Sequence, residues 1–122
     1  MKLIRLMMVI GALAFAMPLV SLKAAAHSAL TSSSPADGTV VAAAPAEIEM
    51  MFRSVAQLIR FRLTGADGND VTLGEDHLMV KARRHQVELP PIGTGDFTAR
   101  WRAMSEDGHL LKGDFSFRVG SD

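Results

Sequence analysis

The strongest constraint on the fold is an alternation of apolar and polar side chains over residues 97–105. The odd positions carry Phe97, Ala99, Trp101 and Ala103, and the even positions carry Thr98, Arg100, Arg102 and Met104. Successive side chains of a β-strand point to opposite faces, so this period of two predicts a strand that is buried on one face. Trp101 is the largest of the inward-facing residues and is expected at the centre of the core.

The same alternation recurs in shorter stretches along the chain, at residues 48–52, 59–63 and 115–119. Weaker patterns predict short strands at 71–73, 78–81 and 86–89, and an edge strand early in 27–46. Residues 65–69 are rich in glycine, aspartate and asparagine, which predicts a hairpin turn. Helical periodicity is hard to find. The sequence therefore predicts a single all-β domain, an immunoglobulin-like β-sandwich or barrel of about seven strands.

Residues 1–26 have the three parts of a secretory signal peptide. Basic Lys2 and Arg5 precede an apolar run over residues 6–20, and three alanines end at Ala26. The apolar run is shorter than the roughly 20 residues that cross a bilayer, so we expect cleavage rather than a membrane-spanning helix. The expected organisation is a signal peptide, 1–26, followed by one exported domain, 27–122, that does not itself span a membrane.

Composition narrows the chemistry of the exported domain. Three of the 13 lysines and arginines fall within residues 1–26, which leaves ten against 13 acidic residues and a net charge of −3. The only basic cluster visible in the sequence is Lys81, Arg83 and Arg84, so nucleic-acid binding is not expected. The chain has no cysteine, which excludes disulfides and thiolate metal sites.

Cleavage after Ala26 would expose His27 as an N-terminal histidine, whose α-amine and imidazole Nδ1 can chelate one metal ion. Asp107 and His109 stand two residues apart, so in extended backbone they would project to the same side and add a carboxylate and a second imidazole. Nitrogen and oxygen donors of this kind suit Cu(II), and zinc is the competing metal. Taken alone, a motif such as Asp107-Gly108-His109 is in most cases only a polar turn with no metal.

Several segments resemble the CopC family of periplasmic copper-resistance proteins. The segments are His27-Ser28-Ala29-Leu30, Ser34-Pro35-Ala36-Asp37-Gly38, Ala44-Pro45-Ala46-Glu47-Ile48, Trp101-Arg102-Ala103-Met104-Ser105-Glu106-Asp107-Gly108-His109, Gly113 and Phe115-Ser116-Phe117-Arg118-Val119. The resemblance implies an immunoglobulin-like Greek-key β-sandwich that holds Cu(II) through His27, Asp107 and His109. It also implies a periplasmic location and a CopD-like inner-membrane protein as partner.

The chain departs from the family pattern in two places. Family members often have an acidic residue at the third position of Phe52-Arg53-Ser54, and some bind Cu(I) in a methionine-rich loop, whereas residues 64–84 here contain only Met79 and a neighbouring histidine. The other methionines are expected to pack in the core or stand alone. His77 and His85 are expected to be surface histidines that titrate freely.

Three functions are weighed. The leading expectation is a periplasmic Cu(II) carrier or buffer in copper resistance or homeostasis, without turnover. The first alternative is a copper oxidase or monooxygenase that uses the same histidine chelate; Asp107 would then occupy a position that oxygen needs, and the short chain lacks long loops for a substrate surface. The second is a metal-free β-sandwich adaptor, since this architecture hosts many functions.

Overall fold

The computed structural model describes residues 29–120, and these form six β-strands and no helix. The strands are β1 (Leu30–Ser34), β2 (Thr39–Val41), β3 (Glu47–Gly65), β4 (Lys81–Glu88), β5 (Gly95–Ser105) and β6 (Leu110–Val119). They join in one sheet of order β1-β3-β5-β6-β2, with β4 paired to β3. The predicted all-β class is confirmed. No helix among these residues is long and apolar enough to cross a membrane.

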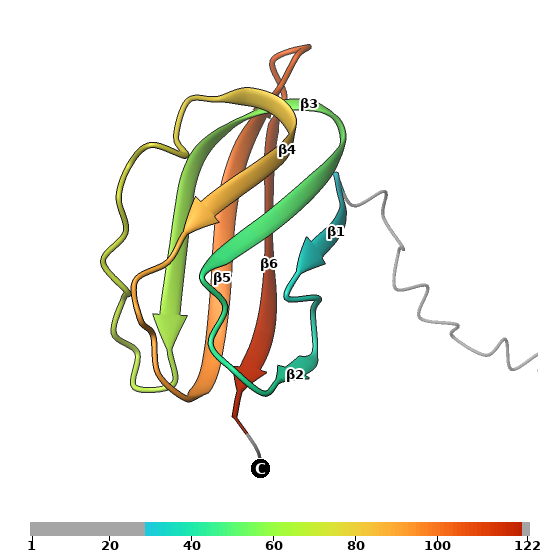
Figure 1. Ribbon diagram of the computed structural model, residues 1–122. Coiled ribbons are helices and arrows are strands. Elements are labelled where there is room, and N and C mark those ends of the chain that lie inside the picture. The colour runs from blue at the N-terminus through green and yellow to red at the C-terminus, as the bar shows by residue number, and fades with distance from the viewer. Residues whose placement is uncertain (1–28, 121–122) are drawn as a thin grey trace, which may run out of the picture.

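Strand β3 belongs to both layers of the curled sheet. Its first half pairs with β1 and β4, and its second half, from Ala56 to Gly65, pairs with β5. The pairing with β4 shifts in register between Met51 and Ala56, where the strand bends. Figure 1 shows the result: the first half of β3 and β4 cross in front of a layer made by the second half of β3, β5 and β6.

The strand boundaries differ from the sequence prediction. The stretches 48–52 and 59–63, predicted as two strands, are parts of the single strand β3, because residues 53–58 contain no glycine or proline that would end it. Residues 71–73 and 78–80 lie outside the strands, and of 86–89 only residues 86–88 belong to a strand, as the end of β4. The described residues thus contain six strands where about seven were predicted.

A β-bulge in β3 also alters one predicted face. Leu58 pairs with Ala103 and Arg60 with Arg102, so two steps along β3 match one step along β5. The bulge places Leu58 in the core with Phe61 and Leu63, whereas Ile59, which was expected to face inward, is only partly buried. Uniform alternation cannot reveal such a shift, because the bulge is defined by pairing with a distant strand.

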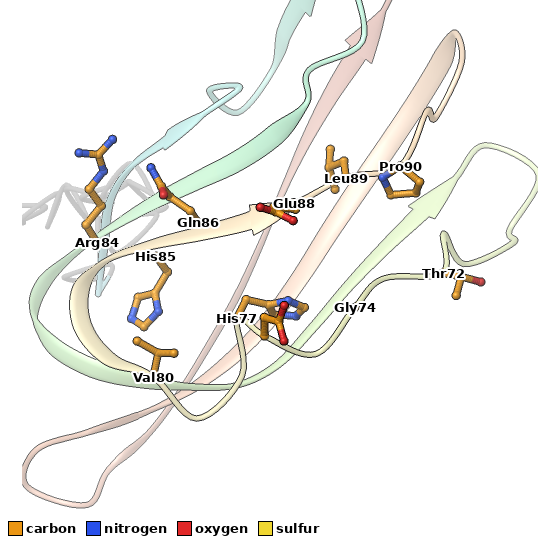
Figure 2. Close-up of a pocket in the computed structure, with 11 residues that line it drawn as sticks. Thr72, Gly74, His77, Val80, Arg84, His85, Gln86, Glu88, Leu89 and Pro90 are labelled. Carbon is orange, nitrogen blue, oxygen red and sulfur yellow. The ribbon is translucent and has the colours of Figure 1, made fainter.

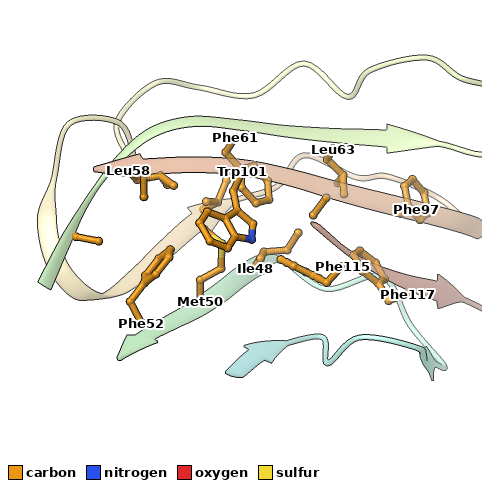
Figure 3. Packing of buried hydrophobic residues seen from close by; sticks show 14 of the residues in the cluster. Ile48, Met50, Phe52, Leu58, Phe61, Leu63, Phe97, Trp101, Phe115 and Phe117 are labelled. Atoms are coloured by element: carbon orange, nitrogen blue, oxygen red, sulfur yellow. The ribbon is translucent and has the colours of Figure 1, made fainter. Parts of the chain in front are cut away.

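The core lies between the two layers and is built from β3, β4, β5 and β6 (Figure 3). The faces predicted for β5 and β6 are confirmed, since Phe97, Ala99, Trp101, Ala103, Phe115, Phe117 and Val119 are all buried. Trp101 is 3% exposed, and its ring meets that of Phe52 edge-on, with 5.0 Å between ring centroids. Directly across from Trp101 on β6 stands Gly113, where a Cβ atom would lie only 2.6 Å from the indole. The glycine makes room for the tryptophan.

Candidate metal centre

The turn between β5 and β6 carries Asp107 and His109. Two backbone hydrogen bonds close it: Ser105 N–H donates to the His109 carbonyl at 2.9 Å, and Gly108 N–H donates to the Ser105 carbonyl at 3.0 Å. Gly108 has a φ of 84°, a left-handed conformation that glycine adopts without strain. The two candidate ligands are therefore brought together by a tight turn, and not by the extended backbone that the sequence reasoning assumed.

The side chains of this turn form a hydrogen-bonded cluster. Asp107 Oδ2 lies 2.8 Å from His109 Nδ1, and Asp107 Oδ1 accepts a hydrogen bond from the Ser105 hydroxyl. The same hydroxyl oxygen accepts the His109 backbone N–H at 3.0 Å. The Ser105 hydroxyl, followed by the His109 side chain, lowers the pKa of Asp107 from its usual 3.8 to about 2. The carboxylate is thus charged at every pH at which a histidine is neutral.

The cluster leaves donor atoms for a metal. The side chains of Asp107 and His109 are 67% and 76% exposed. Because the contact to Asp107 engages Nδ1, the ring nitrogen of His109 available to a metal is Nε2, and metal-bound histidines commonly direct their other nitrogen to a carboxylate in this way. Asp107 Oδ2 also keeps a lone pair beyond the one that it shares with His109, whereas Oδ1 accepts hydrogen bonds from the Ser105 hydroxyl and, at 3.5 Å, from the His109 N–H.

The third predicted ligand, His27, lies outside the described residues. Ala29, two residues after it, lines a groove of about 310 Å³ together with Asp107 and His109. Its carbonyl accepts a hydrogen bond from Arg53 N–H at 2.8 Å, which holds this end of the chain against β3. Figure 1 shows that β1 begins at the end of the molecule where the β5–β6 turn lies. Residues 29–120 alone hold no cluster of three histidine or acidic side chains that could bind a metal.

The other two histidines differ from the prediction. His85 is 3% exposed, and its Nε2–H donates to the carbonyls of Ala56 at 2.9 Å and Ala82 at 2.8 Å, so it is a structural core residue. His77 is partly buried against Phe61, and burial lowers its pKa. Both line a pocket of about 640 Å³ between β4 and the preceding loop (Figure 2). Neither is an exposed surface histidine.

Sequence reasoning missed the role of Ser105. Its hydroxyl contacts both candidate ligands, Asp107 through the side chain and His109 through the backbone. A serine two residues before an aspartate in a short hairpin turn is a local signal that could have been used, since such hydroxyls commonly bond within turns.

Comparison with known proteins identifies the family of the chain. A family model described as the CopC domain matches residues 30–120. A protein named Copper resistance protein C from Pseudomonas syringae pv. tomato is 32% identical over 115 residues, which cover 83% of this chain and 86% of the relative. The chain belongs to the CopC family. A second CopC relative, Copper resistance protein C from Xanthomonas campestris pv. juglandis, is 31% identical over 110 residues with the same coverage.

Solved structures of CopC proteins share the fold. CopC from Methylosinus trichosporium OB3b superposes with a TM-score of 0.62 at 24% identity, covering 77% of this chain and 94% of that one. PcoC, described as a methionine-rich copper resistance protein from Escherichia coli, superposes with a TM-score of 0.58 at 27% identity, covering 77% and 99%. The β-sandwich predicted for this CopC chain is therefore confirmed.

Proposed function

We propose that this CopC-family chain is an exported Cu(II)-binding protein that carries or buffers copper in the periplasm. Its copper ligands would be His27, after cleavage behind Ala26, together with Asp107 and His109. The observation that carries the proposal is the shared groove: Ala29, Asp107 and His109 line one surface at one end of the sandwich. The relatives' names, which refer to copper resistance, support copper as the cargo.

The length of chain between Ala29 and His27 is sufficient for this ligand set. Two extended residues span about 7 Å, and Ala29 already lines the same groove as Asp107 and His109, so we expect an amine and imidazole at position 27 to reach the β5–β6 turn. The donors would then be the α-amine, two imidazole nitrogens and a carboxylate oxygen. This nitrogen-rich set without thiolate favours Cu(II), which binds more tightly than other divalent first-row metals to such ligands.

The exposure of the turn supports a carrier rather than a storage cage. Asp107 and His109 lie at the surface, so an incoming ligand from a partner could replace them one at a time. A CopD-like protein of the inner membrane is the partner that the family resemblance suggests.

A carrier does not catalyse a reaction, so copper-loaded protein should not consume oxygen with ascorbate faster than free copper does. Sustained, substrate-dependent oxygen consumption would favour the oxidase or monooxygenase alternative.

The ligand set is tested by competition titration of Cu(II) with electron paramagnetic resonance on single variants. His109→Ala removes the imidazole, and Cu(II) affinity should fall by more than about 100-fold. That is the largest loss usual for a residue that only orients a metal ligand, so a greater loss indicates a ligand. The spectrum should also change. The variant His77→Ala, which changes a histidine far along the chain from the turn, is the matched control and should bind as the parent does. Parent-like affinity in His109→Ala would contradict the proposed site.

Asp107 is tested separately. Asp107→Asn keeps the shape of the side chain and removes its charge, and the affinity should fall by about 10–100-fold, whether the carboxylate binds copper or only orients His109. An unchanged affinity would remove Asp107 from the site.

A further inference from the structure

The outer face of the layer formed by β5, β6 and the second half of β3 is strongly basic. It carries five exposed cationic side chains from three strands, here called the basic face: Arg60, Arg62, Arg100, Arg102 and Lys112. They are half of the ten lysines and arginines in residues 29–120. Because they are scattered in sequence, the sequence alone gave no sign of this cluster.

The strand register places like charges opposite one another. Arg60 pairs with Arg102, Arg62 with Arg100, and Arg102 also with Lys112. Like charges directly opposite in a sheet are destabilising, each pair by a fraction of a kcal/mol, so this arrangement does not serve folding. The repulsion would be relieved by an anion lying over the face.

Acidic groups on this face offset only part of its charge. Asp70 accepts a hydrogen bond from Arg62 Nε at 3.1 Å, and Asp114 stands opposite Arg100 in the ladder. Five cations and these two acids leave a local charge of +3. Glu106 and Asp107 lie beyond the end of the face, in the β5–β6 turn. Within residues 29–120, Arg60, Arg102 and Lys112 form no ion pair.

The basic face is shaped for a broad anionic surface rather than for a protein. The cations surround a shallow hollow of about 390 Å³ whose floor includes Trp101 and Gly113. Protein interfaces usually have an apolar centre and a polar rim. Here five of the eight residues around the hollow are cationic, and the exposed Leu110 lies at the edge of the face, beside Met104. An array of guanidinium groups matches an array of phosphates.

The overall negative charge of the chain does not prevent such docking. The acids Glu47, Glu49 and Glu88 lie on β3 and β4, in the other layer of the sandwich. Their side chains alternate with buried Ile48 and Val87, so they point to the opposite side of the molecule from the basic face. A surface that touches the basic face therefore interacts mainly with its cations.

We propose that the basic face docks on the anionic phospholipid surface of a membrane. Leu110, 58% exposed, would enter the headgroup region at the edge of the contact. The β5–β6 turn, which continues directly from Lys112, would then lie beside the bilayer. The basic face shares no residue with the proposed copper site, so the two proposals are tested independently.

The test is co-sedimentation of the metal-free chain, purified from the periplasmic fraction, with phosphatidylglycerol or phosphatidylcholine vesicles. Binding should be selective for phosphatidylglycerol and should weaken as salt is raised. Lys112→Glu removes one positive charge and adds a negative one, so at about fivefold per charge the affinity should fall roughly 25-fold. Lys81→Glu makes the same change on β4 and should alter binding by less than about twofold, on the same scale. Circular dichroism checks that both variants fold.

Three results would overturn membrane docking. The first is equal binding to the two kinds of vesicle, and the second is an equal loss for Lys112→Glu and Lys81→Glu. The third is release from vesicles by inorganic phosphate, but not by chloride at the same ionic strength, which would indicate a discrete phosphate site. Binding to polyglutamate without binding to vesicles would likewise replace the membrane with an acidic protein partner.

Discussion

Gly113→Ala should destabilise the domain, because the added methyl group has no room beside Trp101. A Cβ atom at this position would lie 2.6 Å from Cζ2, 2.9 Å from Cε2 and 3.1 Å from Nε1 of the indole. Ordinary van der Waals contact begins near 3.4 Å, so the ring or strand β6 must move by almost 1 Å. The indole is 3% exposed and packs edge-on against Phe52, which leaves it little freedom.

The expected cost combines two opposing effects. Overpacking of a core costs about 1–3 kcal/mol, and the reduced entropy of the unfolded chain on replacing glycine returns about 0.4–1 kcal/mol. We therefore expect a loss of about 1–2 kcal/mol in the free energy of unfolding, which corresponds to a fall in Tm of roughly 4–16 °C for a domain of this size.

Urea denaturation followed by tryptophan fluorescence measures this cost, and Gly74→Ala is the matched control. Nothing lies within 4 Å of a Cβ at Gly74, so this variant should be as stable as the parent or more stable by up to about 1 kcal/mol. In a Trp101→Phe background, which lacks the indole atoms in question, the cost of Gly113→Ala should shrink; circular dichroism replaces fluorescence there. A neutral Gly113→Ala, or a cost unchanged by Trp101→Phe, would refute the steric explanation.

Three further predictions follow from named contacts. His85→Phe leaves the buried carbonyl of Ala56 and the part-buried carbonyl of Ala82 without their donor, so it should cost about 1–3 kcal/mol in urea denaturation. No loss would contradict the structural role of His85. Ser105→Ala removes the largest cause of the low pKa of Asp107, so NMR titration of that carboxyl should show the pKa rising from about 2 toward 3.8; an unchanged value would contradict that hydrogen bond. Cu(II) affinity should fall as pH drops below about 7, because free amines, with a pKa of about 7.7–8.0, and imidazoles, with a pKa of about 6.5, gain protons, whereas Asp107 remains charged. An affinity that stays constant from pH 8 to 5 would contradict the ligand set.

The linkage of Asp107 to folding has the same direction as that of the amine and imidazoles to copper, but it acts at lower pH. Its pKa is lower in the folded chain than the usual 3.8, so any stability that it contributes is fully present above that value and is lost as pH falls toward about 2. The loss of this contribution, between pH 3.8 and about 2, and the loss of copper affinity below about pH 7 should therefore be separate events.

The sequence predicted those parts of the fold that depend on neighbouring residues. The inward faces of β5 and β6 follow from alternation, which is a local property of an extended chain. The continuity of β3, its bulge at Leu58 and Arg60, and the burial of His85 depend on pairing between distant strands. Alternation within one segment cannot supply that information.

The candidate site was predictable for a similar reason. Asp107 and His109 are close in sequence, and the structure brings their side chains to 2.8 Å within one turn. The role of Ser105 required the hydrogen-bonding geometry of that turn, and the basic face required the register of three strands. The part played by His27 stays a prediction, because it depends on a cleavage event and on residues outside 29–120.

That prediction is tested most directly by Cu(II) titration with electron paramagnetic resonance on two preparations of the domain. One begins at His27, and the other carries one extra residue before it, which turns the α-amine of His27 into an amide. The account predicts tight binding and a nitrogen-rich Cu(II) spectrum only for the chain that begins at His27. The same spectrum and affinity in both preparations would contradict the N-terminal chelate and, with it, the proposed copper site.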